Sequence, residues 1–383
     1  MRSARIGRRL LVAVTASATS VLALAACSSS GGGDSGTGKS ANGPGGGDLS
    51  KTITVKYGNN AVCHLVMWTA VKNGYFKDEG LNVKASPQAG ASAALVPLLA
   101  TGKVDFATIT PGGAFFNGPS QGFDVRAIYS EETPIAGYLS VVKVMVRQEL
   151  WDTGQFKTLD DLKKPGLRFL SVGTRTGGAD DSAFHALLNK MGVKESDVKE
   201  VVLPDATTTA QDVINLFKSD KIDIGVYNAP ATDIMEAQKI AHAWLGYADI
   251  MPWYQDCLIG ASAGYIKKNP EITQKFVQAL MKASQYVSQA KGKMTPELAK
   301  IVGDVTGFTA QQISLSATPN TTNNGQMSIE SLVETQKLLQ SEGLIPKPIS
   351  DPSTLLEGGP LDAARKAMNI TGPAVVPNNA TGS

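Results

Sequence analysis

The chain has 383 residues, of which 42% are hydrophobic, 18% charged and 6% aromatic, and this balance excludes a disordered, collagen-like or disulfide-dense protein. The formal net charge of +2 becomes −2 once the four arginines of the first nine residues are set aside, leaving 32 basic against 34 acidic residues. A weakly acidic body lacks the basic surface that nucleic-acid binding needs. Because only three cysteines and three histidines are present, we expect neither a metal site nor a cofactor.

The N-terminal segment has the pattern of an export signal. Its arginines precede a run of 17 apolar or small residues, Leu10–Ala26, which is short for a membrane-spanning helix. The run ends in Leu24-Ala25-Ala26-Cys27 and resembles a bacterial lipobox, in which the cysteine is acylated and becomes the first mature residue. A plain secretory signal with an incidental cysteine is the alternative. We predict a signal peptide over residues 1–26 and a lipid anchor at Cys27, on the extracytoplasmic face of the cell membrane.

A tether and then a globular body follow the predicted anchor. Of residues 28–50, 15 are glycine or serine, so residues 27–50 are predicted to form a flexible tether. Beyond it, strands and helices alternate. Strands are predicted at 52–57, 81–85, 104–109, 125–129, 138–146 and 167–172, and helices at 65–76, 93–101 and 182–191. The chain becomes mainly helical from 270 to 343, and a short helix at 361–368 lies in a loosely attached tail. This alternation predicts parallel α/β sheets.

One segment of the body recurs 118 residues later. Lys103-Val104-Asp105 matches Lys221-Ile222-Asp223, with an apolar helix before each tripeptide and a buried strand after it. Any two strand–helix–strand units share part of this pattern. The repeat nevertheless favours two similar lobes, with a ligand beyond the carboxyl ends of the strands of both.

Leader, lipobox, tether and repeated α/β pattern together resemble the substrate-binding lipoproteins of ABC importers. The resemblance is greatest to the nitrate/sulfonate/taurine and thiamine-pyrimidine (NMT1/THI5-like) group and covers about residues 52–345. It is carried, in order, by the segments Gly74–Leu81, Gly102–Ala107 and Thr158–Leu162, which read GYFKDEGL, GKVDFA and TLDDL. The cysteine-rich stretch of that group's pyrimidine-making enzyme has no counterpart here, which favours a binding protein over an enzyme.

This resemblance implies a type II periplasmic-binding-protein fold, an α/β fold of two lobes with a ligand cleft between them. Lobe 1 would comprise residues 51–142 and 258–350, lobe 2 residues 143–257, and the tail residues 351–383. Two crossover strands, near Ser140–Arg147 and Cys257–Tyr265, would form the hinge. The implied function is capture of a small solute, a sulfonate-, nitrate- or taurine-like anion, by a monomer that delivers it to the transmembrane subunits of an ABC permease. A thiamine-pyrimidine or other heterocyclic vitamin precursor is the alternative ligand, and a signalling lipoprotein is the alternative role.

The residues expected to contact the ligand come from loops of both lobes. Each also has an ordinary structural explanation: core packing for Trp68, helix capping for His64 and Ser92, and a tight turn for the glycines before Asp180, where Arg175 would add charge to an anion site at a helix start. Asp205 and Tyr254 are weaker candidates. The expected ligand-binding residues are Asn60, His64, Trp68, Gly90, Ala91, Ser92, Thr110, Thr176, Gly177, Gly178, Tyr227 and Asn228.

Two further sequence features bear on chemistry. Cys63 and Cys257 are the only cysteines after Cys27, and an oxidising compartment permits a disulfide between them; two separate buried thiols are the alternative. Gly260–Gly264 fits the G-x-S-x-G pattern around Ser262, but no histidine follows it, so a secreted hydrolase with the chain order Ser, acid, His is not expected. We therefore predict no catalytic residues.

Overall fold

The computed structural model describes residues 48–88, 91–133, 141–172, 178–204 and 208–378, with backbone alone at Ala91 and Ser92. These residues belong to one compact unit. The predicted signal peptide, Cys27 and nearly all of the predicted tether lie outside them. Among the helices of the described ranges, none is both long and apolar enough to cross a lipid bilayer.

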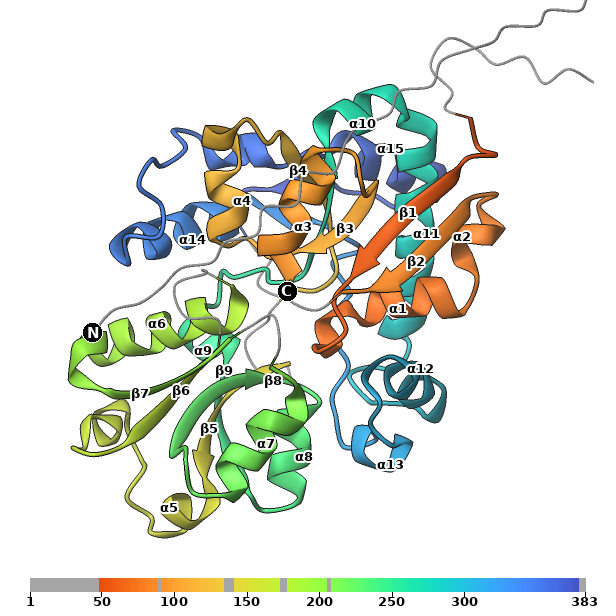
Figure 1. The fold of residues 1–383 in the computed structure, drawn as a ribbon. Helices are drawn as coiled ribbons and strands as arrows, with labels where there is room; N and C mark the ends of the chain where they lie inside the picture. The colour runs from red at the N-terminus through yellow and green to blue at the C-terminus, as the bar shows by residue number, and fades with distance from the viewer. Residues whose placement is uncertain (1–47, 89–90, 134–140, 173–177, 205–207, 379–383) are drawn as a thin grey trace, which may run out of the picture. The chain divides into compact units, whose positions relative to one another are not determined.

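The first sheet has five strands in the order β2-β1-β3-β10-β4 (Figure 1). β1 (Thr52–Tyr57) is parallel to β2 (Asn82–Pro87) and β3 (Phe106–Ile109), whereas β10 (Leu258–Ser262) is antiparallel to β3 and to β4 (Val125–Ser130). Phe106 stacks on Phe276 of helix α11 (Pro270–Ser288), while its neighbour Ala107 packs in another core with helix α3 (Ala91–Ala100). Successive residues of a strand point to opposite faces, so helices cover both faces of this sheet.

The second sheet also has five strands, in the order β7-β6-β8-β5-β9. Its parallel strands are β6 (Arg168–Val172), β7 (Lys199–Leu203) and β8 (Ile224–Asn228), and β5 (Val142–Arg147) is antiparallel to β8 and to β9 (Ala241–Gly246). Val144 and Val146 pack with helix α6 (Ala179–Met191), and Met145 packs with α7 (Ala210–Lys218) and α8 (Ala231–Ala237). Burial on both faces explains why the three inner strands, β5, β6 and β8, are mostly apolar.

The two sheets share one topology, which accounts for the sequence repeat. Taken in the same order, β1, β2, β3, β4 and β10 correspond to β6, β7, β8, β9 and β5. The repeated aspartates have matching roles before β3 and β8. Asp105 accepts from the backbone N–H of Thr54 (2.7 Å), and Asp223 accepts from that of Arg168 (2.9 Å). Each carboxylate thereby joins the start of one strand to the start of its neighbour.

The chain passes between the sheets twice, once between Ser130 and Val142 and once between Gly246 and Leu258. The predicted crossover strands correspond to β5 and β10, the antiparallel strand inside each sheet. The predicted helix at 65–76 is interrupted, because Gly74 adopts a left-handed conformation between α1 (Leu65–Lys72) and α2 (Tyr75–Asp78). Smaller helices are α4 (Gly113–Asn117), α5 (Gln148–Asp152), α9 (Tyr247–Ile250) and α10 (Ala263–Lys268), with 3₁₀ turns η1 (Val62–His64), η2 (Pro119–Gln121), η3 (Leu159–Lys163), η4 (Glu195–Asp197) and η5 (Pro352–Leu355).

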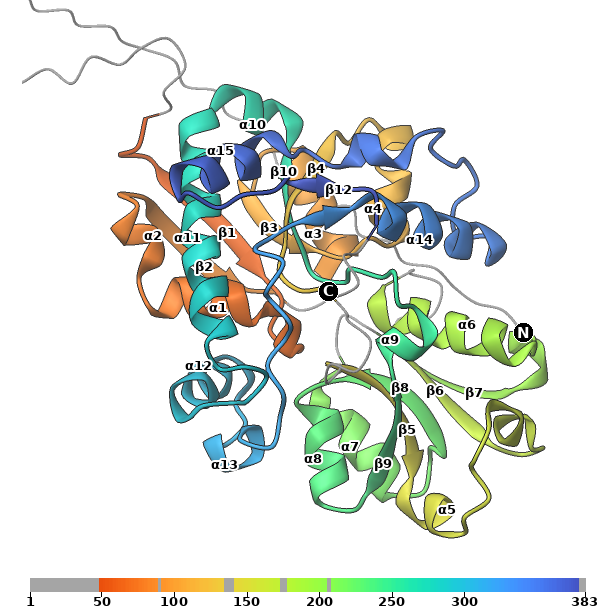
Figure 2. The same ribbon diagram turned by 180° about the vertical axis from the view of Figure 1, so that it is seen from behind.

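The C-terminal third contains helices α12 (Pro296–Thr306), α13 (Ala310–Ile313), α14 (Ile329–Ser341) and α15 (Gly359–Ala367), and the short parallel pair β11 (Met327–Ser328) and β12 (Val375–Val376). The expectation of a loosely attached tail is wrong for its described part. α15 packs on α11, as the view from behind shows (Figure 2). Leu361 and Ala364 of α15 are fully buried. The apolar spacing within 361–368 therefore marks a core-facing helix.

Candidate functional site

A pocket lies where loops from the carboxyl ends of both sheets meet. Asn60 follows β1, Thr110 follows β3, Asn228 ends β8 and Asp180 lies in the first turn of α6, after β6. Ligands of open α/β sheets bind at this end of the strands. The volume is about 60 Å³, well below that of sites for drug-sized ligands, so the present shape fits a small solute. The described lining residues are Asn60, Ala61, Cys63, His64, Ala93, Thr110, Gly112, Gly113, Ala114, Val172, Gly178, Ala179, Asp180, Asn228, Asp256 and Cys257.

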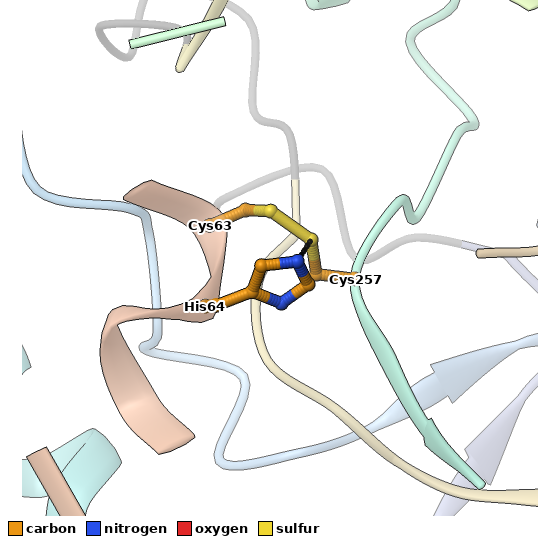
Figure 3. A group of neighbouring side chains, drawn as sticks. All are labelled: Cys63, His64 and Cys257. Carbon is orange, nitrogen blue, oxygen red and sulfur yellow. Dashed lines mark hydrogen bonds between the residues drawn. A yellow bond between two sulfur atoms is a disulfide. The ribbon is translucent and has the colours of Figure 1, made fainter. Parts of the chain in front are cut away.

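A disulfide between Cys63 and Cys257 fixes one wall of the pocket (Figure 3). It joins the 3₁₀ turn η1 to the residue that precedes β10, and both half-cystines are buried. The His64 ring lies against the bridge, with Nε2 3.8 Å from the Cys257 sulfur. Because the two sulfur atoms are bonded to each other, they are not thiolates and do not form a zinc site with His64.

His64 belongs to a buried hydrogen-bond network behind this wall. Its Nδ1 lies 3.1 Å from Oε2 of Glu131, and Oε1 of the same carboxylate accepts from the backbone N–H of Met67 at 2.8 Å. Burial raises the pKa of Glu131, while the hydrogen bond and charge of His64 and the Met67 N–H oppose the shift. A Cβ on Gly58 would lie 2.3 Å from Nε2 of His64, so only glycine at position 58 leaves room for this ring. His64 therefore lines the pocket with a side chain that the network already positions.

The opposite wall approaches the first through Asn228 and Ala229. The backbone N–H of Val62 donates to the carbonyl oxygen of Ala229 at 3.0 Å. In the orientation that satisfies both of its amide atoms, the side chain of Asn228 donates to the carbonyl oxygen of Asn60 at 2.8 Å. These two bonds join the loop after β1 of the first sheet to the end of β8 of the second.

Carboxylates dominate the charge of the described lining. Asp180 lies in the first turn of α6, and Asp256 accepts from the hydroxyl of Thr110 at 3.3 Å. An oxygen of Glu132, a buried residue, lies within 4.8 Å of one of Asp256. Burial raises the pKa of Glu132 well above its usual range, and the charges of Asp256 and Glu131 raise it further. Neither lysine nor arginine occurs among the lining residues that the structure describes. This part of the lining is suited to accept hydrogen bonds from a ligand.

The structure brings together five of the predicted ligand-binding residues, namely Asn60, His64, Thr110, Gly178 and Asn228. Two more of the predicted residues, Trp68 and Tyr227, lie in the core and are absent from the described lining. Trp68 is fully buried in the core and donates its indole N–H to the carbonyl oxygen of Gly58 at 2.8 Å. Tyr227 points to the other side of β8 from Asn228 and packs in the core with α7 and α8. Both are large aromatic residues, and apolar burial determines where they lie.

The remaining predicted residues are not described, are described without a side chain, or do not line the pocket. Gly90, Thr176, Gly177, Arg175 and Asp205 are outside the described residues, and Ala91 and Ser92 begin helix α3 with no side chain described. Tyr254 is fully buried and absent from the described lining. Sequence reasoning missed Asp180 and Asp256. The only signal for them was position, since one follows the glycine turn after β6 and the other precedes Cys257.

Comparisons with known proteins agree with this architecture. A family model described as NMT1/THI5 like matches residues 61–291. A curated relative, the putative binding protein YtlA of Bacillus subtilis (strain 168), is 23% identical over 234 residues; the match covers 61% of this chain and only 65% of the relative. Two solved structures share the fold. The periplasmic nitrate-binding protein NrtA from Synechocystis PCC 6803 is 13% identical with a TM-score of 0.68, covering 85% of this chain and 92% of that one. The periplasmic aliphatic sulphonate-binding protein SsuA from Escherichia coli is 15% identical with a TM-score of 0.61, and the match covers 80% of this chain and 92% of that one. The predicted two-lobed periplasmic-binding-protein fold is confirmed.

Proposed function

Because the chain belongs to the NMT1/THI5-like family, we propose that it is the extracytoplasmic solute-binding component of an ABC importer. It is anchored to the membrane through a lipid on Cys27 and delivers one small solute to the transmembrane subunits of the permease. The observation that supports this role best is the pocket, which is lined by loops from the carboxyl ends of two sheets of matching topology. A binding protein that closes on its ligand needs this arrangement, because each lobe then supplies one wall.

The ligand that this lining favours carries N–H donors, as an aminopyrimidine or a related vitamin precursor does. Asp180 and Asp256 bring carboxyl groups to the lining, and Asn60, Thr110 and Asn228 add polar groups around them. A carboxylate accepting from a ligand N–H forms a charge-assisted hydrogen bond, which is stronger than a neutral one. Nitrate and simple sulfonates carry no N–H group to donate to these two side chains, so we expect them to bind less well.

A small anion is the second candidate. It is favoured by the likeness of fold to the nitrate-binding and sulphonate-binding proteins, although likeness at such low identity concerns the fold alone. The predicted anion-binding turn before α6 falls on residues 173–177, outside the described ranges, and only Gly178 is seen to line the pocket. Taurine combines both chemistries, since it has an ammonium group and a sulfonate.

Binding without covalent chemistry agrees with the geometry around Ser262. This residue ends β10, and its hydroxyl caps α10 by accepting from the backbone N–H of Tyr265 at 3.2 Å. It is absent from the described lining of the pocket, whereas Cys257 at the other end of the same strand lines it. A nucleophilic serine must instead lie beside a base and face the substrate.

A ligand screen on the mature protein tests the proposal. We expect 4-amino-5-hydroxymethyl-2-methylpyrimidine to raise the melting temperature, and nitrate and ethanesulfonate to have no effect; taurine completes the panel. A ligand at 100 times its dissociation constant adds about 2.7 kcal/mol of stability. Asp180→Asn and Asp256→Asn should each weaken binding about tenfold or more, since each removes a charged acceptor, while Asp197→Asn, at an exposed position outside the pocket, should bind normally.

The possible outcomes separate the two candidates. Stabilisation by nitrate or ethanesulfonate that survives both pocket substitutions would establish the anion candidate. Normal binding of the aminopyrimidine by both the Asp180 and the Asp256 variants would show that its site is not at these carboxylates and that the pocket is misplaced.

A further inference from the structure

Outside the pocket, a buried histidine meets two carboxylates where α6 packs against α14. His185 lies on α6 and is 4% exposed. Its Nε2 is 3.5 Å from Oε2 of Glu195, which begins the turn η4, and 3.7 Å from Oε2 of Glu342, which follows α14. The three atoms all lie within 4.8 Å of one another. None of these residues lines the described pocket.

The contacts of the other ring nitrogen, Nδ1, determine whether Nε2 carries a proton in the neutral ring. Nδ1 lies 2.9 Å from the carbonyl oxygen of Asp181, one helical turn earlier, and 3.4 Å from an oxygen of the Asp181 carboxylate. Both neighbours are acceptors, so Nδ1 carries a proton and donates it. In the neutral ring Nε2 then presents a lone pair toward Glu195 and Glu342. Three atoms with lone pairs then face one another, which is an arrangement that can hold a metal ion.

The spacing of the three atoms suits a metal. Zinc–nitrogen and zinc–carboxylate bonds of about 2.0–2.2 Å in a tetrahedron place neighbouring ligand atoms about 3.3–3.6 Å apart, close to the two distances measured from Nε2. A histidine that donates its other N–H to a backbone carbonyl is the usual arrangement of a metal ligand. Oε1 of Glu342 is held by the side chains of Asn189 (3.4 Å) and Ser341 (3.5 Å), which leaves Oε2 to face His185.

We propose that His185, Glu195 and Glu342 form a binding site for a zinc ion, with water as the fourth ligand. The carboxylates are partly exposed, at 26% for Glu195 and 20% for Glu342, so an ion and its water reach the site from solvent. The site joins two parts of the molecule. Leu338 of α14 packs in the core around α6, whereas Leu332 and Leu339 of the same helix pack in a core of the first sheet. A bound ion therefore ties α6 of the second sheet to a helix that also packs on the first.

Zinc titration of the mature protein, purified without a histidine tag, tests this site. We expect one equivalent to bind in competition with a chromophoric chelator, and Co²⁺ to give the intense visible absorption of a tetrahedral complex. His185→Ala should abolish binding, and Glu342→Gln, which keeps the size of the side chain, should weaken it at least tenfold. The matched control is His242→Ala, because His242 is also in the second sheet's unit but stacks on Trp151 with ring centroids 4.0 Å apart.

The results are decisive in either direction. If His185→Ala does not fold, Glu342→Gln carries the comparison. The proposal is overturned if the wild-type protein binds no zinc at micromolar concentration, or if Glu342→Gln binds as tightly as the wild type. Loss of binding in His242→Ala alone would place the metal elsewhere.

Discussion

At the scale of single residues, Asp223 shows how one carboxylate can organise a sheet. Its oxygens accept from the backbone N–H of Arg168 and from Nε and Nη2 of the same residue, and Nη2 of Arg147 lies 3.2 Å from Oδ1. Burial alone would raise the pKa of Asp223, but the hydrogen bonds and charges of Arg168 and Arg147 outweigh it and lower the pKa. The ionised form is therefore the one that stabilises the fold.

We expect Asp223→Asn to destabilise the protein by about 2–3 kcal/mol at pH 7, since it removes hydrogen bonds to a charged, largely buried group. The direction of the pH dependence follows from the lowered pKa of Asp223. The carboxylate of Asp223 contributes its full stabilisation at pH values above its pKa in the unfolded chain, which is about 4. This stabilisation is lost as the pH falls through the lower pKa of the folded state. Urea unfolding of the wild type and variant at pH 7, 5 and 3.5 measures this. The difference in free energy of unfolding between the wild type and Asp223→Asn should narrow only at the lowest pH. The exposed Asp197→Asn is the control. A difference that stays constant over this pH range would contradict the lowered pKa of Asp223.

At the scale of elements, Arg365 attaches the C-terminal segment. It is 5% exposed on α15, and its guanidinium donates to the carbonyl oxygens of Gly372 (3.1 Å) and Asn324 (3.2 Å). Arg365→Ala should lower the free energy of unfolding by about 2–4 kcal/mol, because it removes a buried side chain and several backbone carbonyls lose a charged donor. Hydrogen exchange should also accelerate at β11 and β12. The exposed neighbour Lys366→Ala should change neither quantity, and unchanged exchange in the Arg365 variant would show that β12 is held by other contacts.

Comparison of the predicted and observed elements shows which parts of the fold can be predicted from the sequence. Apolar spacing is a local signal, so β1, β4 and the position of α15 follow from it within a residue or two. The repeat around Asp105 and Asp223 predicts two similar lobes because each copy encodes a strand-joining carboxylate. The pocket is less readable. Asp180 and Asp256 are far apart in the chain and meet only in the fold, while Trp68 carries the same apolar signal whether it faces a ligand or the core.

At the scale of the whole molecule, the proposed function requires the two lobes to open and close. Among the described residues, two hydrogen bonds cross the pocket between loops of the two lobes: the Val62–Ala229 backbone bond and the Asn228–Asn60 side-chain bond. A hydrogen bond of this kind contributes about 1 kcal/mol, which is enough to change the ratio of open to closed molecules about fivefold. Losing one such bond should therefore shift the conformational population without unfolding either lobe.

We expect Asn228→Ala to shift the ligand-free protein toward the open form. Small-angle scattering should then give a radius of gyration larger than that of the wild type, for which a compact body of this size predicts about 20 Å. The melting temperature should change little, and affinity for the solute found in the screen should fall, because closure then costs more free energy. Asn215→Ala, on the exposed face of α7, is the control. Unchanged scattering together with weakened binding would mean that Asn228 contacts the solute directly, and that other contacts hold the lobes together.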